Sequence, residues 1–170
     1  TQGVSSAASD VYKRQAELAL SIEQNNLVAK SNYAKALTIN DKLPEAIKLF
    51  KEIIKINPDC ENYKSLGTAF RNAGEFEESC ICFEKALEYE PNDYSCFFNL
   101  CASKVSQPNI DMLLRFEKKL KTEKNIDYSE KGSIAFALYN SYHKLREFDK
   151  AGNFLLLGNK FLDNWIASDI

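Results

Sequence analysis

The sequence predicts an all-α protein built from antiparallel helix pairs stacked side by side. Apolar residues recur at i, i+3, i+4 and i+7, which is the spacing of one helix face. This pattern returns with a period of about 34 residues, and Pro44, Pro58 and Pro91 fall where the helices of such pairs would begin or end. A composition of 45% hydrophobic and 27% charged residues over 170 residues is ordinary for one globular domain.

The charge balance narrows the class of partner. Lys and Arg number 22 against 24 Asp and Glu, which gives a net charge of −2. A nucleic-acid binder needs a basic face that displaces counterions from phosphates, and a polybasic membrane-surface protein needs a similar excess of cations. No apolar run is long enough to span a bilayer. We therefore predict a protein or peptide partner, with no nucleic acid and no membrane.

The clearest repeat covers residues 60–93. Its first helix has one apolar face, a turn follows at Asn72-Ala73-Gly74, and the second helix has another apolar face. We expect Gly67 and Ala86 to lie where two helices approach most closely, because neither position leaves room for a larger side chain. Two phenylalanines fill the space between neighbouring helices, each worth roughly 1.5–3 kcal/mol on burial. The predicted packing positions are Tyr63, Leu66, Gly67, Phe70, Phe83, Ala86 and Pro91.

This segment resembles a tetratricopeptide repeat (TPR), a helix–turn–helix unit of about 34 residues. The match includes the family's aromatic residues, its Leu-Gly pair, its Phe, its Ala and its Pro, while Ser79 stands in place of a usual Ala. The resemblance implies a TPR-like α-solenoid with a right-handed superhelix. It also implies a protein-interaction scaffold that binds a peptide or protein segment in the concave groove lined by the first helix of each pair.

Looser repeats are predicted on both sides of this one. The proposed helical domain, residues 16–170, divides into a truncated helix at 16–26 and helix pairs at 27–59, 60–93, 94–127 and 128–170. In the third pair, Asp111 is expected to cap a second helix from Met112 to Lys121. In the last pair, Tyr139 replaces the small residue of the close contact, which leaves the packing angle of that pair open.

The first residues are set apart from this fold. Residues 5–15, SSAASDVYKRQ, resemble the in-frame translation of a transposase adapter used in preparing DNA sequencing libraries, so residues 1–15 are interpreted as an artefactual or disordered tail. The alternative is an ordinary polar tail. We expect the natural sequence to begin near Ala16, which makes the chain a fragment. Apolar surface around Leu18, Leu20 and Ile22 would then be exposed and favour self-association.

The C-terminal half carries a second resemblance. Phe136-Ala137-Leu138, Phe148-Asp149-Lys150-Ala151 and Gly158-Asn159 are similar to motifs in the repeat region that precedes the catalytic domain of TPR-type sulfotransferases. The resemblance implies an alternative role as the non-catalytic leading part of such an enzyme, with the catalytic domain beyond residue 170. Within this chain there is no G-x-x-x-x-G-K-[ST] loop to hold nucleotide phosphates, so we expect no enzymatic activity of its own.

Catalytic and metal-binding interpretations have little support in the sequence. His143 is the single histidine, and the five cysteines form no C-x-x-C pair, so we predict no metal site and no cofactor. The cysteines fit better as small buried apolar residues. An odd number without a disulfide framework favours a reducing compartment, and hence a cytoplasmic location.

The candidate binding residues are those that the first helices would present to the groove. The middle of the groove would be basic and could attract an acidic segment, while Phe98 would pack an apolar side chain; the alternative is that these are ordinary surface residues. The Lys, Asn and Arg set with which TPR domains grip a C-terminal carboxylate is essentially absent, because Ser31, Lys35, Thr68, Phe98 and Ala102 occupy its positions. The candidates are Lys35, Lys64, Thr68, Arg71, Phe98 and Asn140.

Overall fold

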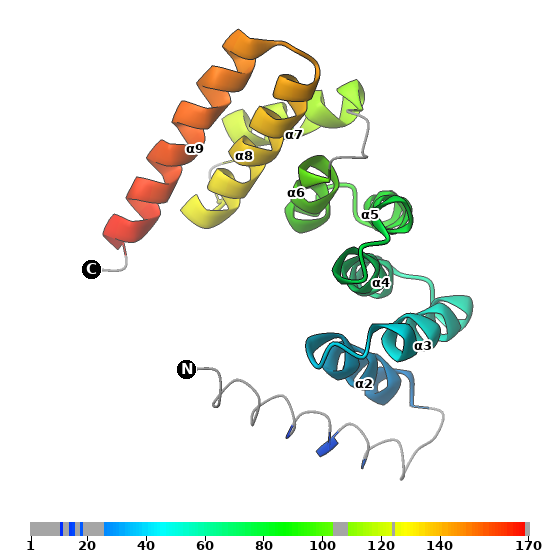
Figure 1. Cartoon of the computed structure of the whole chain (residues 1–170). Helices are drawn as coiled ribbons and strands as arrows, with labels where there is room; N and C mark the ends of the chain where they lie inside the picture. Colours follow the sequence, from blue (N-terminus) through cyan, green and yellow to red (C-terminus); the bar gives the residue numbers. More distant parts are fainter. Residues whose placement is uncertain are drawn as a thin grey trace. The chain divides into compact units, whose positions relative to one another are not determined.

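The computed structural model describes residues 11, 14, 15, 18, 26–103, 109–123 and 125–168. The chain divides into two compact units, Thr1–Tyr89 and Glu90–Ile170. Every regular element of the described residues is an α-helix, which confirms the all-α prediction (Figure 1).

The first unit holds two helix pairs. They are α2 (Leu27–Ile39) with α3 (Leu43–Ile56), and α4 (Cys60–Asn72) with α5 (Phe76–Tyr89). Neighbouring helices in this series pack against one another, and α2 also contacts α4. Their apolar faces merge into one core, because each amphipathic helix must cover its stripe with another element. The core comprises Ala34, Leu37, Ala46, Ile47, Phe50, Ile53, Leu66, Ala69, Phe70 and Cys82.

The first helix of each pair begins in the same way. Asn26, Asp59, Asp93 and Asp127 each lie immediately before a helix, and each side chain accepts a hydrogen bond from the backbone N–H three residues later, at 3.0, 2.7, 2.7 and 2.7 Å respectively. These oxygens satisfy N–H groups that have no partner within the helix. The N-caps therefore recur at nearly the same period as the apolar pattern and indicate the same repeat.

The turns inside three of the pairs are also alike. Asp41, Gly74 and Arg146 have φ angles of 58°, 80° and 61°. The N–H of the following residue donates to the carbonyl five residues earlier, at 2.9, 3.0 and 2.9 Å. This arrangement is the Schellman ending of a helix, for which glycine is the least strained residue. Two of the three turns therefore hold a non-glycine residue in the left-handed region.

Gly67 lies at a close approach of α4 and α5. A Cβ atom added there would lie 3.1 Å from Cε1 of Phe83 and 3.2 Å from Cβ of Cys82. Phe83 is 1% exposed and Ala86 is fully buried, so both predicted contact positions of α5 face the core. Tyr63 stacks on Tyr89 with ring centroids 5.8 Å apart, while Pro91 is exposed just after α5.

The second unit contains α6 (Tyr94–Ala102), α7 (Ile110–Thr122), α8 (Tyr128–Lys144) and α9 (Phe148–Ser168). Phe97 and Phe116 stack with ring centroids 3.8 Å apart, which fixes α7 against α6. The ammonium of Lys144 donates to the carbonyl of Cys101 at 3.0 Å and to that of Ser103, so α8 supplies a cation to the C-terminal end of α6.

The predicted start of α7 was wrong. Asn109, not Asp111, is the N-cap, and its side chain accepts from the N–H of Met112 at 3.0 Å. Both residue types can cap a helix. The earlier cap lengthens the helix and leaves Asp111 in its first turn, where the helix dipole favours a carboxylate.

In the last helix pair, the small residue of the close contact lies on the second helix, α9. Tyr139 is half-buried, and the small residue is Gly158 on α9, where an added Cβ would lie 3.0 Å from Cε1 of Phe136. The glycine thus moves to the second helix of the pair. Near the other end of the chain, Leu18 is 63% exposed, whereas Leu20 and Ile22 lie outside the described residues. Self-association at that end remains a prediction.

Candidate functional site

The candidate site of the first unit lies on its two neighbouring first helices, α2 and α4. Lys35 comes from α2, and Lys64, Thr68 and Arg71 come from α4. The two helices contact each other directly. Four of the six predicted binding residues therefore lie on adjacent helices of one compact unit. This is the arrangement expected when the first helices of successive pairs stack side by side.

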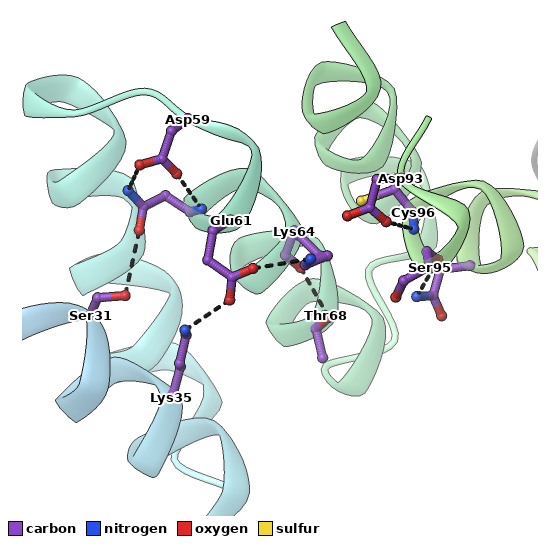
Figure 2. A network of polar contacts seen from close by, with 11 residues as sticks. Ser31, Lys35, Asp59, Glu61, Lys64, Thr68, Asp93, Ser95 and Cys96 are labelled. Atoms are coloured by element: carbon purple, nitrogen blue, oxygen red, sulfur yellow. Dashed lines mark hydrogen bonds and ion pairs between the residues drawn. The ribbon is translucent and has the colours of Figure 1, made fainter. Parts of the chain in front are cut away.

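Glu61 joins the two lysines of this face. Lys35 Nζ lies 2.9 Å from one oxygen of the carboxylate, and Lys64 Nζ lies 3.0 Å from the other. Figure 2 shows the two ammonium groups on either side of Glu61. The Lys35 contact connects α2 to α4, whereas the Lys64 contact joins residues three apart on α4. Sequence reasoning identified both lysines but missed the carboxylate between them.

The ion pairs are partly exposed to solvent. The side chains of Lys35, Lys64 and Glu61 are 40%, 28% and 55% exposed respectively. Burial would by itself raise the pKa of Glu61, but the hydrogen bonds from the two lysines outweigh it and hold the pKa below its usual value. The carboxylate is therefore ionised at neutral pH, and both ammonium groups are held toward one point on the surface.

A buried asparagine fixes the entry to α4 beside these ion pairs. Asn62 is 6% exposed. Its backbone and side-chain nitrogens donate to Asp59 at 2.7 and 3.0 Å, its side chain also donates to the carbonyl of Asn57 at 3.0 Å, and its carbonyl oxygen accepts from Ser31 at 3.4 Å. Because a buried amide needs such partners, this network holds the first turn of α4, and hence Glu61, against α2.

Thr68 and Arg71 continue the face toward the end of α4. The Thr68 hydroxyl donates to the carbonyl of Lys64 at 3.0 Å, one turn earlier. Arg71 is exposed in the last turn of the helix. Lys64, Thr68 and Arg71 lie on one face of α4, because residues three and four apart share a helix face.

The other two predicted residues belong to the second unit. Phe98 on α6 and Asn140 on α8 are both half-buried, and these two helices pack on each other. A half-buried phenylalanine can offer part of its ring to a ligand. Phe98 and Asn140 therefore form a separate candidate surface on the second unit.

The charges of the first unit are unevenly divided between its helices. Helices α2 and α4 carry four cations, Lys30, Lys35, Lys64 and Arg71, against one carboxylate, Glu61. Helix α5, with the sequence FEESCICFEKALEY, carries four glutamates against one lysine. Helix α3 also carries three lysines against two glutamates, so α2, α3 and α4 are each net positive and α5 is the acidic helix of the first unit.

The thiols and the histidine are in different surroundings. All five cysteines are buried and none forms a disulfide. Burial raises the pKa of the Cys82 and Cys101 thiols to about 11, so these two are protonated at neutral pH and are poor nucleophiles. His143 is exposed and lies between the rings of Tyr139 and Phe148, with centroids 5.9 and 5.6 Å away.

Two comparisons with known proteins agree with this geometry. Residues 60–93 match the tetratricopeptide repeat family. The fold is similar to that of a solved protein described as "Crystal structure of MamA", with a TM-score of 0.70 and 14% sequence identity, covering 96% of this chain and 94% of that one. No curated protein matches the sequence.

The remaining observations concern membrane helices and the sulfotransferase resemblance. Among the described residues, no helix is long and apolar enough to cross a membrane. Neither comparison bears on the resemblance to sulfotransferase-associated repeats, which stays a prediction. The segment 60–93 is thus a tetratricopeptide repeat, and the chain has the all-helical fold of a TPR-type α-solenoid.

Proposed function

We propose that this protein is a non-catalytic interaction module whose first unit binds an acidic peptide or protein segment. The segment would lie on the face formed by α2 and α4 and contact Lys35, Lys64, Thr68 and Arg71. The observation that carries this proposal is the convergence of Lys35 and Lys64 on one exposed carboxylate. Because both ammonium groups are partly exposed and held toward one point of the surface, they can attract an approaching anion.

The charge distribution supports an acidic ligand. Three cations lie on this part of α2 and α4 beside two carboxylates, Glu61 and the cap Asp59, so an approaching carboxylate meets a net positive surface. Such attraction between partly exposed charges weakens as ionic strength rises, because the Debye length falls from about 10 Å at 0.1 M salt to about 3 Å at 1 M. The proposed binding must therefore be salt-dependent.

Titration with a defined probe tests the proposal. The probe is a short fluorescein-labelled peptide of alternating Glu and Leu residues, followed by fluorescence anisotropy at low and high salt, and the control probe has Gln in place of Glu. We expect saturable binding of the acidic probe that weakens about tenfold or more in the Lys64→Glu/Arg71→Glu variant. The matched control variant is Lys48→Glu/Lys55→Glu, which changes two exposed lysines of α3 and should bind as the unaltered protein does.

Several outcomes would contradict this function. Equal affinity for the acidic and Gln probes would show that charge does not select the ligand. Unchanged affinity across salt concentrations, or an equal loss in the two double variants, would remove the role of the α2–α4 face. Phe98 and Asn140 would contribute an apolar and an amide contact on the separate surface of the second unit, which a Phe98→Ala variant tests with the same probe.

We also propose a cytoplasmic location. The support is the burial of five free thiols, which behave as small apolar residues in the core. A reducing compartment keeps such thiols unpaired. Fractionation of cells that produce the tagged protein would place it in the soluble cytoplasmic fraction, and recovery from a secreted fraction would contradict the proposal.

A further inference from the structure

Glu61 occupies the position that a carboxylate of an acidic ligand would take between Lys35 and Lys64. One oxygen of Glu61 lies 2.9 Å from Lys35 Nζ, and the other lies 3.0 Å from Lys64 Nζ. An Asp or Glu side chain of a ligand presents the same group, with two acceptor oxygens at the same spacing. The unbound protein thus already holds between its two lysines the chemical group that the proposed ligand would bring (Figure 2).

The contact between Lys35 and Glu61 joins two helices. These residues are 26 positions apart in the sequence, whereas an ion pair such as Lys85–Glu88 joins residues three apart on α5. The packing of α2 on α4 therefore brings Lys35 to a carboxylate whose other oxygen already faces Lys64. Because two carboxylates at one point repel each other, a ligand carboxylate that contacts both lysines in this way must replace Glu61.

The Glu61 side chain can leave this position while the helices stay in place. Its side chain is 55% exposed, so rotation about its own bonds would carry the carboxylate into water. The first turn of α4 is held separately, because the backbone and side-chain nitrogens of Asn62 donate to Asp59 at 2.7 and 3.0 Å. These hydrogen bonds do not involve the Glu61 carboxylate. Its displacement therefore needs only a change of side-chain conformation.

We propose that Glu61 is an internal competitor of the acidic ligand. It occupies Lys35 and Lys64 in the unbound protein, and a carboxylate of the ligand replaces it on binding. This inference rests on the proposed function and adds which contact the ligand must displace. Ion pairs this exposed each change an equilibrium constant by at most about fivefold, so Glu61 would weaken the binding of the ligand without abolishing it.

The test removes the charge of Glu61 and measures binding of the acidic Glu-Leu probe to the full chain by fluorescence anisotropy. We expect Glu61→Gln to bind this probe about three- to tenfold more tightly than the unaltered protein does, and to gain nothing toward the Gln probe. The matched control is Glu84→Gln, which removes one exposed carboxylate of α5 and changes the net charge equally. It should bind as the unaltered protein does. Circular dichroism checks that both variants retain their helices.

A double-mutant cycle assigns the gain to the contact between α2 and α4. Lys35→Met removes the ammonium group and keeps an unbranched side chain. In the Lys35→Met background, Glu61→Gln should strengthen binding by a clearly smaller factor than in the unaltered protein, because one of the two ion pairs of Glu61 is already absent. An equal gain in the two backgrounds would show that Glu61 does not act through Lys35 and would contradict the proposal.

The outcomes distinguish failure of this inference from failure of the proposed function. If the acidic probe binds the unaltered protein and Glu61→Gln leaves its affinity unchanged, the competitor role is wrong and the acidic-ligand function stands. Weaker binding by Glu61→Gln would also overturn the inference, and would show that Glu61 positions the two lysines for the ligand. An equal gain in Glu84→Gln would reduce the effect to overall charge. No binding of the acidic probe to the unaltered protein or to Glu61→Gln would remove the function and this inference together.

Discussion

Replacement of Gly67 by alanine tests the close approach of α4 and α5. The new Cβ would lie 3.1 Å from Cε1 of Phe83 and 3.2 Å from both Cδ1 of Phe83 and Cβ of Cys82. The Phe83 ring is 1% exposed and enclosed by the core, and Cys82 Cβ is fixed to the backbone of α5. Alanine favours the helix by about 1 kcal/mol over glycine, but overpacking a filled core costs about 1–3 kcal/mol. We expect Gly67→Ala to lower the free energy of unfolding by about 1 kcal/mol.

Gly152 provides the matched control for this substitution. It lies inside α9, and an added Cβ would meet no atom within 4 Å. Only the helix preference acts there, so Gly152→Ala should stabilise the protein by about 0.5–1 kcal/mol. Urea unfolding followed by circular dichroism would separate the two variants by about 1 M in midpoint for a slope near 2 kcal/mol/M. If Gly67→Ala proved as stabilising as Gly152→Ala, the argument for a tight contact would fail.

Substitutions at three further positions test the helix cap, a turn and an ion pair of the fold. Asp59→Ala removes the cap of α4 and should lower the free energy of unfolding by about 2 kcal/mol, whereas Asp59→Asn should keep most of the stability. Thermal unfolding of the two variants tests this. A melting temperature of Asp59→Ala equal to that of the unaltered protein would contradict the capping role. Arg146→Gly relieves a left-handed backbone and should raise the free energy of unfolding by about 0.5–1 kcal/mol, while a loss of stability would show that the arginine side chain matters more than its φ angle. Glu61 has a lowered pKa, so its contribution is complete above the ordinary carboxyl pKa and is lost as pH falls through the lowered value. The stability difference between the unaltered protein and Glu61→Gln, at most about 1 kcal/mol for pairs this exposed, should therefore shrink in urea titrations from pH 6 to pH 3, and a difference that grew on acidification would reverse the sign assigned here.

Much of the packing could be predicted because it depends on residues close in sequence. Gly67 and Ala86 are small where two antiparallel helices of one pair meet, and a short turn joins those helices. The turn and the helix period together determine which positions face each other. Where the pattern was weaker, in the last pair, the close contact moved to Gly158, since either helix of a pair can supply the small residue.

The candidate site was only partly predictable, because it depends on a contact between residues far apart in the sequence. Glu61 resembles any exposed carboxylate in the sequence, and its contact with Lys35 depends on the distance between α2 and α4. The lysine three residues after it was a usable signal, because residues three apart share a helix face. The caps at Asn26, Asp59 and Asp93 offered a second overlooked signal, since Asn or Asp recurs there at nearly the repeat period.

The most direct test of the proposed function is to map the acidic probe onto the protein by NMR. Backbone amide shifts of the isotope-labelled full chain would be recorded during titration with the Glu-Leu peptide. Our account predicts that the largest changes cluster on α2 and α4 around Lys35, Lys64 and Arg71, and that they diminish in high salt. Changes concentrated on α3 and α5, or a spectrum that the peptide leaves unaltered, would contradict it.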